Sequence, residues 1–151
     1  MNFSPPPARR PGARARALGA GALLFAPLVA LAADLQLSVV DGPAKPATLY
    51  VALYDSADSY AADKKLAAQT APMPAGNAKL AFSGLAPGRY ALRVFADENG
   101  NGKLDTNLMG MPTERYGFSN DAVGDRAAPG FDAAAFQVKA ESLQAVVIHL
   151  R

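Results

Sequence analysis

Residues 88–97, GRYALRVFAD, show the clearest alternation of apolar and polar side chains in this chain. Tyr90, Leu92 and Val94 fall on one side of an extended backbone, whereas Arg93 falls on the other. A period of two residues is the pattern of a β-strand that buries one of its faces. This stretch therefore predicts a strand that packs against a core on one side.

The same alternation recurs before and after this stretch. Five more runs show it, most of them closed by Gly, Pro, Asn or Asp, at residues 35–40, 48–55, 78–85, 134–139 and 143–150. The Ala-rich segment 56–69 predicts a short surface helix with Ser56 or Asp58 as its N-cap. Six to seven short strands and one short surface helix predict an all-β fold, a two-sheet antiparallel β-sandwich of the Ig-like or prealbumin-like kind.

Residues 1–32 have the three parts of an export signal. Four arginines form a positive start, residues 17–31 are apolar, and an A-x-A cleavage pattern ends at Ala32. Cleavage near Ala32 or Ala33 would leave a single domain, residues 34–151, in the periplasm or outside the cell. An uncleaved anchor is the alternative. No second apolar stretch follows, so we expect no transmembrane segment after removal of the signal.

Removal of the signal reverses the charge of the chain. Four of the fifteen basic residues leave with it and none of the thirteen acidic residues does, so the mature domain carries a formal charge of −2 (11 minus 13). We therefore expect no nucleic-acid partner. The chain has no cysteine and a single histidine, His149. This composition excludes thiol chemistry and disfavours both a hydrolytic triad and a zinc site.

Residues 97–105, DENGNGKLD, place oxygen-bearing side chains at every second position of the first half of the loop. A calcium loop of the EF-hand type uses side chains at positions 1, 3 and 5, a glycine at 6, a backbone carbonyl at 7 and an oxygen at 9. Here those positions hold Asp97, Asn99, Asn101, Gly102, Lys103 and Asp105. Further oxygens could come from Glu114, Asp121 or Asp125, or from water. The spacing predicts a calcium site of modest affinity, because the loop contains only two carboxylates at ligand positions.

Two features leave a plain hairpin turn open as the alternative. Position 12 of an EF-hand loop is a glutamate, and here it is Leu108. Asn99-Gly100 and Asn101-Gly102 are also each a strong hairpin signal, although a two-residue hairpin needs only one such pair. Calcium is favoured over magnesium because the loop is flexible and supplies its ligands from protein alone.

Residues 97–130 form one long connection that is rich in Gly, Pro, Asn and aromatic side chains after the calcium-type loop. A connection of this length in a compact domain is either functional or disordered, and Tyr116 and Phe118 indicate order. These two aromatics, with Met109 and Met111, either pin the connection to the sandwich or line a groove, and we expect mainly pinning. The candidate binding residues of this connection are Tyr116, Phe118 and Asn120.

The stretch GRYALRVFADENGNGKLDTNLMGMPTERYGFSND, residues 88–121, closely resembles the signature of a bacterial exported family, the domain-of-unknown-function family 2141. The family pattern Asp-x-Asn-x-Asn-Gly-x-Leu-Asp falls on the loop that runs from Asp97 to Asp105. The segment after the loop matches at Gly110, Pro112, Glu114, Tyr116, Gly117, Phe118, Ser119 and Asn120. The likeness spans residues 35–150 and implies a transthyretin-like or prealbumin-like β-sandwich that stands alone after a signal peptide, with no established activity. Where the family pattern has Gly-Pro-Pro, this chain has Ala128-Pro129-Gly130.

These features predict an exported, non-enzymatic module, a structural or binding domain of the cell envelope whose long loop is organised by calcium. We expect its partner to be an envelope protein or a glycan, and the domain to be a monomer. The alternative, from a different class, is a small carboxylate-based hydrolase that uses Asp105 and Glu114. A pocket that holds those two carboxyl groups about 5 to 9.5 Å apart would favour the hydrolase.

Overall fold

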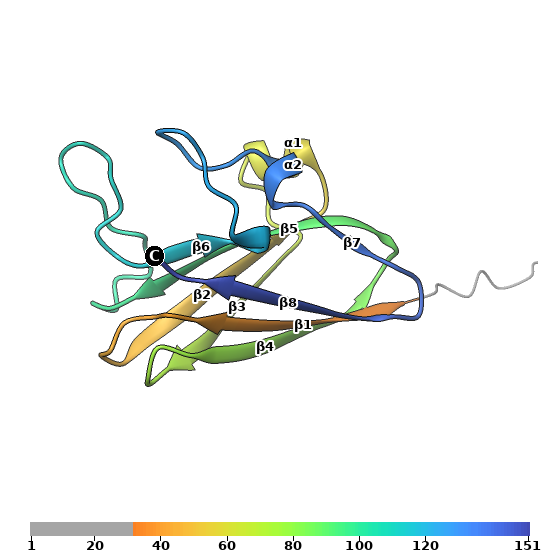
Figure 1. Cartoon of the computed structure of the whole chain (residues 1–151), viewed down its shortest axis with the longest axis horizontal. Coiled ribbons are helices and arrows are strands. Elements are labelled where there is room, and N and C mark those ends of the chain that lie inside the picture. Colours follow the sequence, from red (N-terminus) through yellow and green to blue (C-terminus); the bar gives the residue numbers. More distant parts are fainter. Residues whose placement is uncertain (1–31) are drawn as a thin grey trace, which may run out of the picture.

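The computed structural model describes residues 32–151, which form two β-sheets packed against each other (Figure 1). The predicted export signal, residues 1–32, lies outside the described residues except for its last position. Within residues 32–151, no helix is both long and apolar enough to cross a membrane. The predicted all-β sandwich is confirmed.

The smaller sheet has the strand order β4, β1, β8. These strands cover Ala78–Leu85 (β4), Ala33–Val40 (β1) and Leu143–His149 (β8). β1 is antiparallel to β4 but parallel to β8. The sequence predicted antiparallel sheets, and this one parallel pair departs from that prediction. The parallel pair joins the first and the last strand of the domain. No short hairpin connects these two strands, and the long chain between them permits either direction of pairing.

The larger sheet has the strand order β3, β2, β5, β6. These strands cover Ala67–Met73 (β3), Ala47–Tyr54 (β2), Gly88–Asp97 (β5) and Tyr116–Phe118 (β6). A further short strand, β7 (Phe136–Val138), pairs with the first three residues of β5, ahead of the part that pairs with β6. The strongly alternating stretch of the sequence is therefore the central strand of this sheet.

The core lies between the sheets and is built from alternate residues of the strands. The predicted inward faces of residues 35–40, 48–55 and 88–97 are all buried: Leu35, Leu37, Val39, Leu49, Val51, Leu53, Tyr90, Leu92 and Val94. Burial of one such Leu or Val contributes about 1.5–3 kcal/mol. Tyr90 also fixes the corner between β4 and β5, because its hydroxyl donates to the carbonyl oxygen of Ala86 over 2.8 Å. Tyrosine corners of this kind recur in sandwich folds.

The predicted surface helix is shorter than the segment that suggested it. Helix α1 covers Ala57–Ala61 and begins after Ser56, whose side chain accepts from the N–H of Ser59 as an N-cap. The chain leaves the helix by way of Asp63, which has a φ of +51°, and then forms β3 along the edge of β2. Pairing with β2 outweighs the helix preference of the alanines in this segment.

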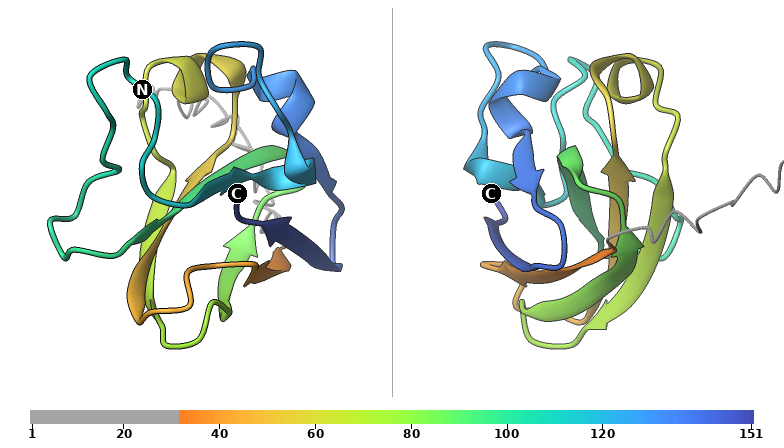
Figure 2. Two further views of the ribbon diagram at one scale, coloured as in Figure 1. Left: turned by 60° about the vertical axis from the view of Figure 1, so that its left-hand side comes forward. Right: turned by 90° about the vertical axis from the view of Figure 1, so that its right-hand side faces the viewer.

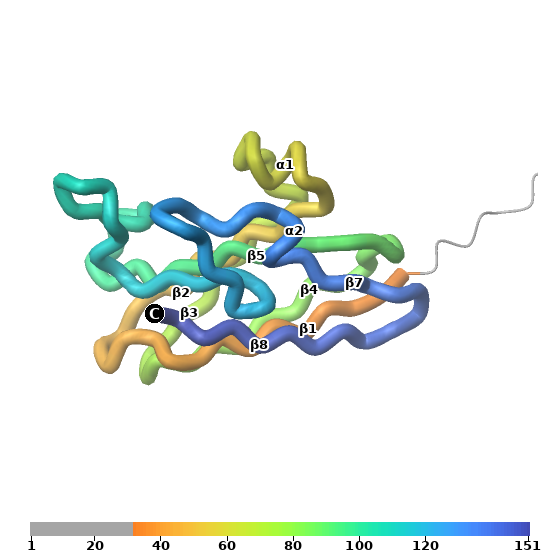
Figure 3. Tube along the Cα trace, turned by 45° about the horizontal axis from the view of Figure 1, so that its top comes forward, coloured from red at the N-terminus to blue at the C-terminus, as the bar shows by residue number. Residues whose placement is uncertain are grey.

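A second hydrophobic cluster lies on the outer face of the larger sheet. Its members are Ala52, Tyr54, Tyr60, Ala91, Phe118, Ala122, Phe131 and Ala134. It is covered by α1, by the 3-10 helix η1 (Ser119–Asp121) and by α2 (Phe131–Ala134), which lie above one part of the sheet (Figures 2 and 3). The long loop after β5 rises beyond the other part of the sheet (Figure 1).

Candidate binding groove and cation loop

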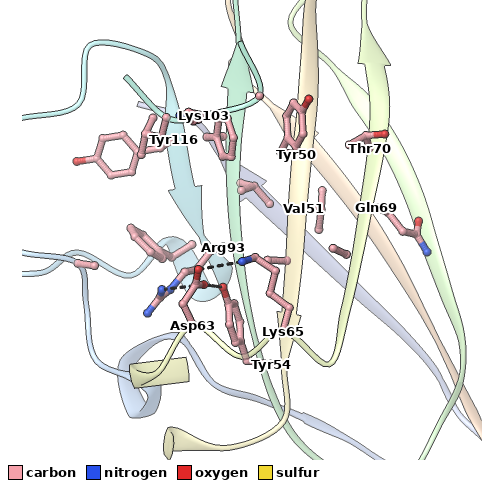
Figure 4. Close-up of a pocket in the computed structure, with 18 residues that line it drawn as sticks. Tyr50, Val51, Tyr54, Asp63, Lys65, Gln69, Thr70, Arg93, Lys103 and Tyr116 are labelled. Atoms are coloured by element: carbon pink, nitrogen blue, oxygen red, sulfur yellow. Dashed lines mark hydrogen bonds and ion pairs between the residues drawn. The ribbon is translucent and has the colours of Figure 1, made fainter. Parts of the chain in front are cut away.

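A groove of about 640 Å³ lies on the part of the outer sheet face that the helices leave uncovered (Figure 4). Tyr50 on β2 and Phe95 on β5 form its floor, with stacked rings whose centroids are 4.9 Å apart and whose planes differ by 6°. Tyr116 lines the groove from β6. A sheet face turned toward water ordinarily carries polar side chains. The core does not need these aromatics, and an apolar hollow of this size has the character of a binding site.

One end of the groove is charged (Figure 4). Asp63 accepts a hydrogen bond from Lys65 at 2.9 Å and another from the hydroxyl of Tyr54. Arg93 Nη1 lies 3.7 Å from the same carboxylate, and Arg93 Nη2 donates to the carbonyl oxygen of Tyr60 at 2.8 Å. The guanidinium carbon of Arg93 also lies 3.8 Å from the centre of the Tyr60 ring, an attractive cation–π contact. These contacts fix the position of the Arg93 charge.

The ionisation states at this end follow from the same contacts. Hydrogen bonds from Lys65 and Tyr54 hold the pKa of Asp63 below its usual value. Burial, and then the hydrogen bond to Asp63, raise the pKa of the Tyr54 hydroxyl. At neutral pH Asp63 is therefore an anion and Tyr54 a neutral donor. The groove is lined by three basic side chains, Lys65, Arg93 and Lys103, and by one acidic side chain, Asp63. Its net charge is therefore +2 (3 minus 1).

The other end of the groove is walled by the predicted calcium loop. Lys103 and Leu104 line the groove from this loop (Figure 4). Gly102 has a φ of +73°, and a Cβ built on it would lie 3.4 Å from the hydroxyl oxygen of Tyr50. Glycine takes this backbone conformation without strain. The glycine at the sixth loop position thus forms the turn and also lets the loop approach the floor of the groove.

Asp97 anchors the turn of this loop from below. It is 2% exposed, and its carboxylate accepts from the backbone N–H groups of Gly100 (2.7 Å), Asn101 (3.3 Å) and Gly102 (2.7 Å). Burial by itself would raise the pKa of this carboxyl group. The backbone hydrogen bonds outweigh that effect and hold the pKa below its usual value. Asp97 is therefore a buried anion that is paired with the loop backbone.

The other predicted ligand side chains meet at Asp105. The amide nitrogen of Asn101 donates to both carboxylate oxygens of Asp105, at 2.9 and 3.0 Å, and the amide nitrogen of Asn99 donates to one of them. The amide oxygens of Asn99 and Asn101 accept from the backbone N–H groups of Asn101 and Lys103, respectively. Among residues 32–151, no three His, Cys, Asp or Glu side chains gather closely enough to hold a metal ion. A cation at this loop would therefore need asparagine oxygens as ligands.

Glu114 joins the two sides of the loop at its base. The side chain is 8% exposed, and its two oxygens accept from the backbone N–H groups of Glu98 (2.9 Å) and Asp105 (3.1 Å). Both oxygens are directed at the backbone. Glu114 therefore holds the loop closed, as Asp97 holds its turn.

The three candidate binding residues have different positions. Tyr116 lines the groove, and its backbone exchanges hydrogen bonds of 3.2 and 3.1 Å with Arg151, which link β6 to the chain beyond β8. Phe118 reaches the groove but is 7% exposed and belongs to the second hydrophobic cluster. Asn120 does not line the groove. Its amide donates to the carbonyl oxygen of Ala135 at 2.9 Å, and it holds the chain around α2 in place.

Residues 106–112 form an ordered tip beyond the loop, closed by a β-bridge at its base. The side-chain oxygen of Asn107 accepts from the backbone N–H groups of Met109 and Met111 at 2.9 and 3.0 Å. Leu108, Met109 and Met111 are nevertheless 108%, 85% and 54% exposed. The prediction that the two methionines pin the connection to the sandwich is wrong, because the turn directs their side chains outward. The aromatic side chains of β6 make the contacts with the sandwich instead.

A groove lined by Tyr116 and Phe118 was predicted only as the alternative to pinning, and its floor and charged end were not predicted. Its signal was present in part, since Tyr50 and Phe95 occupy outward positions of strands whose inward positions hold Leu and Val. Which strands become neighbours is a property of the topology, so the stacked pair could not be inferred from either strand alone. Asp63 and Lys65 carried no signal at all, because the predicted helix placed them on an ordinary solvent-exposed surface.

Fold and site together define an all-β sandwich domain with a hollow aromatic face and a polar loop at its rim. The model of the family described as "Uncharacterized protein conserved in bacteria (DUF2141)" matches residues 38–145. The chain belongs to this family, which confirms the resemblance found in the sequence. The match includes the whole motif of residues 88–121. No match was found among curated proteins or among solved structures.

Proposed function

We propose that this chain is an exported, non-enzymatic module of the cell envelope that docks to a partner through the tip 106–112 and braces that tip with calcium. The observation that carries the proposal is an ordered tip with three large apolar side chains in water, Leu108, Met109 and Met111. Exposed apolar groups that gather at one place mark interaction surfaces, and methionine adapts its shape to a partner. Of the two expected partners, an envelope protein with an apolar pocket fits this surface better than a glycan.

The calcium-type loop, residues 97–105, stands at the base of the tip. The N–H of Thr113 donates to the carbonyl oxygen of Asp105 at 2.8 Å, and the N–H of Asp105 donates to Glu114. A displacement of Asp105 would therefore move both chain segments that lead into the tip, the one before residue 106 and the one after residue 112. A cation bound beside Asp105 would hold the tip in its docking position.

The acceptors of the loop suit calcium in type, and water would complete their number. An amide oxygen has two lone pairs, and those of Asn99 and Asn101 each accept one backbone N–H bond, so each has a lone pair for a cation. A cation beside Asp105 would replace the two amide nitrogens that meet its carboxylate. Calcium accepts six to eight oxygens in a flexible geometry, and the low charge of this loop places it with the weak extracellular sites.

The bonding of the candidate acids supports a non-enzymatic module over the hydrolase. A catalytic carboxyl group must reach its substrate with a free oxygen. Both oxygens of Glu114 accept backbone N–H groups, and both oxygens of Asp105 accept asparagine amides. His149 pairs with Asp121, with Nδ1 2.8 Å from the carboxylate oxygen, and neither lines the groove.

Thermal melts in EDTA and in 1 mM calcium test the cation site. A dissociation constant of about 0.1–1 mM would add about 0.4–1.4 kcal/mol of stability, a rise in Tm of roughly 2–6 °C. Asp105→Asn should abolish the rise. Glu98→Gln is the matched control, because Glu98 is exposed in the same loop between two ligand positions, and it should keep the rise. A calcium response that survives Asp105→Asn would refute this site.

Two further measurements test export and docking. Mass spectrometry of the protein from the periplasmic fraction of cells that express the full chain should give a mature start at Ala33 or Asp34, and an intact Met1 would contradict export. A variant with serine at Leu108 and Met109 should keep its melting temperature, because these side chains are exposed. The same variant should lose the complex that chemical crosslinking traps in the envelope. A complex of unchanged yield would contradict docking by the tip.

A further inference from the structure

We propose that the groove on the outer face of the larger sheet binds a small organic anion that has a flat apolar body. This site does not include the apolar tip, and it uses the side chain of Lys103, whereas the predicted calcium site would use only the backbone carbonyl of that residue. The flat body would lie against the stacked rings of Tyr50 and Phe95, whose centroids are 4.9 Å apart and which extend one apolar surface across β2 and β5. The groove, at about 640 Å³, is within the range of about 300–1,000 Å³ that small-molecule sites occupy.

The charge of the groove selects an anion. Its three basic side chains outnumber its one acidic side chain, although residues 32–151 as a whole have a formal charge of −2 (11 minus 13). Asp63 is already shared between Lys65 and Arg93. In the described part of the chain, Lys103 makes no ion pair. Lys103 therefore offers the cation to which the ligand's anionic group would bind, while Lys65 and Arg93 make the opposite end positive.

The polar groups of the groove are held in place before any ligand binds. Arg93 is fixed by the carbonyl oxygen and the ring of Tyr60, and Lys65 by Asp63. Side chains that are already ordered lose less conformational entropy on binding. Gly102 lets the loop that carries Lys103 approach Tyr50, so the free cation lies next to the aromatic floor.

A pair of fluorescent probes tests the proposal on the purified protein in 1 mM calcium. 8-Anilinonaphthalene-1-sulfonate has a flat apolar body and an anionic group, and N-phenyl-1-naphthylamine is the same body without the charge. We expect the anionic probe to saturate one site per chain with a Kd about fivefold or more below that of the neutral probe. Equal affinity of the two probes would overturn the selection of an anion.

Three variants locate the site. Lys103→Gln should raise the Kd of the anionic probe about three- to fivefold and leave that of the neutral probe unchanged, because one exposed ion pair contributes on that order. Lys79→Gln removes an exposed lysine of β4 on the other sheet and should change neither value. Phe95→Ala should weaken both probes. Equal effects of Lys103→Gln and Lys79→Gln would overturn the location, and these two exposed substitutions do not depend on the folding of the Phe95 variant.

Displacement of the bound probe tests the shape of the ligand. Naphthalene-2-sulfonate and octane-1-sulfonate carry the same anionic group, one on a flat body and the other on a flexible chain. The naphthalene compound should displace the anionic probe at a concentration about two- to tenfold lower, because stacking on aromatic rings contributes about 0.5–1.5 kcal/mol beyond the area buried. Equal displacement would overturn the flat body. The calcium-dependent melts test Asp105, whereas probe binding tests the side chain of Lys103. Failure of the calcium proposal therefore leaves the groove proposal testable, and the reverse also holds.

Discussion

Replacement of Asp97 by asparagine would test whether a buried carboxylate holds the loop that walls the groove. The two oxygens of Asp97 accept three backbone N–H groups at 2.7, 2.7 and 3.3 Å. Asparagine keeps one acceptor oxygen and turns an amide NH₂ toward the N–H groups that faced the other. At least one of these part-buried N–H groups then loses its partner. Because a hydrogen bond to a charged group contributes about 1.5–3 kcal/mol, we expect a loss of about 2–3 kcal/mol in the free energy of unfolding.

Urea unfolding at pH 7 in EDTA measures this loss as a lower midpoint at an unchanged slope. Asp105→Asn is the matched control, because Asp105 lies in the same loop but its carboxylate accepts only exposed side-chain amides. We expect it to change stability by less than about 1 kcal/mol. If the two variants lost the same stability, the reasoning would be refuted, because the backbone bonds to the buried Asp97 would then contribute no more than the exposed bonds to Asp105.

The pH dependence of stability in the wild-type protein and in Asp97→Asn gives an independent measure of what the Asp97 carboxylate contributes. The pKa of Asp97 is depressed below its ordinary value of 3.8, so its contribution to stability is fully present above pH 3.8 and is lost as the pH falls through the lower folded pKa. The wild-type protein should therefore lose stability on acidification below that point. Asp97→Asn should lose less over the same interval, and an unchanged acid limb would contradict the linkage.

Three other substitutions test individual hydrogen-bonded contacts. Tyr90→Phe removes the bond at the β4–β5 corner and should lower the free energy of unfolding in urea by about 1 kcal/mol. Ser119→Ala leaves the buried N–H of Leu92 without its acceptor, and should lose about 1–3 kcal/mol in the same assay. For Asp121, burial raises the pKa, but bonds from the backbone and ring of His149 outweigh it and depress the value below 3.8. Its stabilisation is thus present above pH 3.8 and is lost as the pH falls below that value, so Asp121→Asn should reduce the fall in melting temperature on acidification below pH 3.8.

The strands that could be predicted from the sequence are those whose pattern is set by the core. β5 shows Leu and Val at alternate positions, and burial of those side chains imposes the extended conformation. β3 was missed, because its inward positions include Ala67, Gln69 and Ala71, which carry little apolar signal. Its stability comes from pairing with β2, and alanine-rich local sequence favours a helix when that partner is not known.

The candidate site likewise has one part that could be predicted from the sequence and one part that could not. The loop from Asp97 to Asp105 could be predicted from the sequence, because the hydrogen bonds within it join residues at most six positions apart. The groove could not, because its floor and its charged end come from β2, β5, β6 and the turn after α1. Tyr50 and Phe95 are adjacent through strand register alone. Contacts of this kind follow from the topology, which the sequence pattern of one strand does not contain.

The connection between β5 and β6 indicates where function resides in this domain. These strands are antiparallel neighbours, and a turn of two residues is enough to join such a pair. Residues 98–115 lie between them instead. A longer loop costs only slightly more closure entropy, but an ordered loop also requires fixed contacts, and Asp97 and Glu114 provide them with two buried carboxylates. The sandwich has no need of this arrangement. What it produces is the wall of the groove and the exposed tip, so the two proposed binding surfaces depend on a segment that the fold itself does not require.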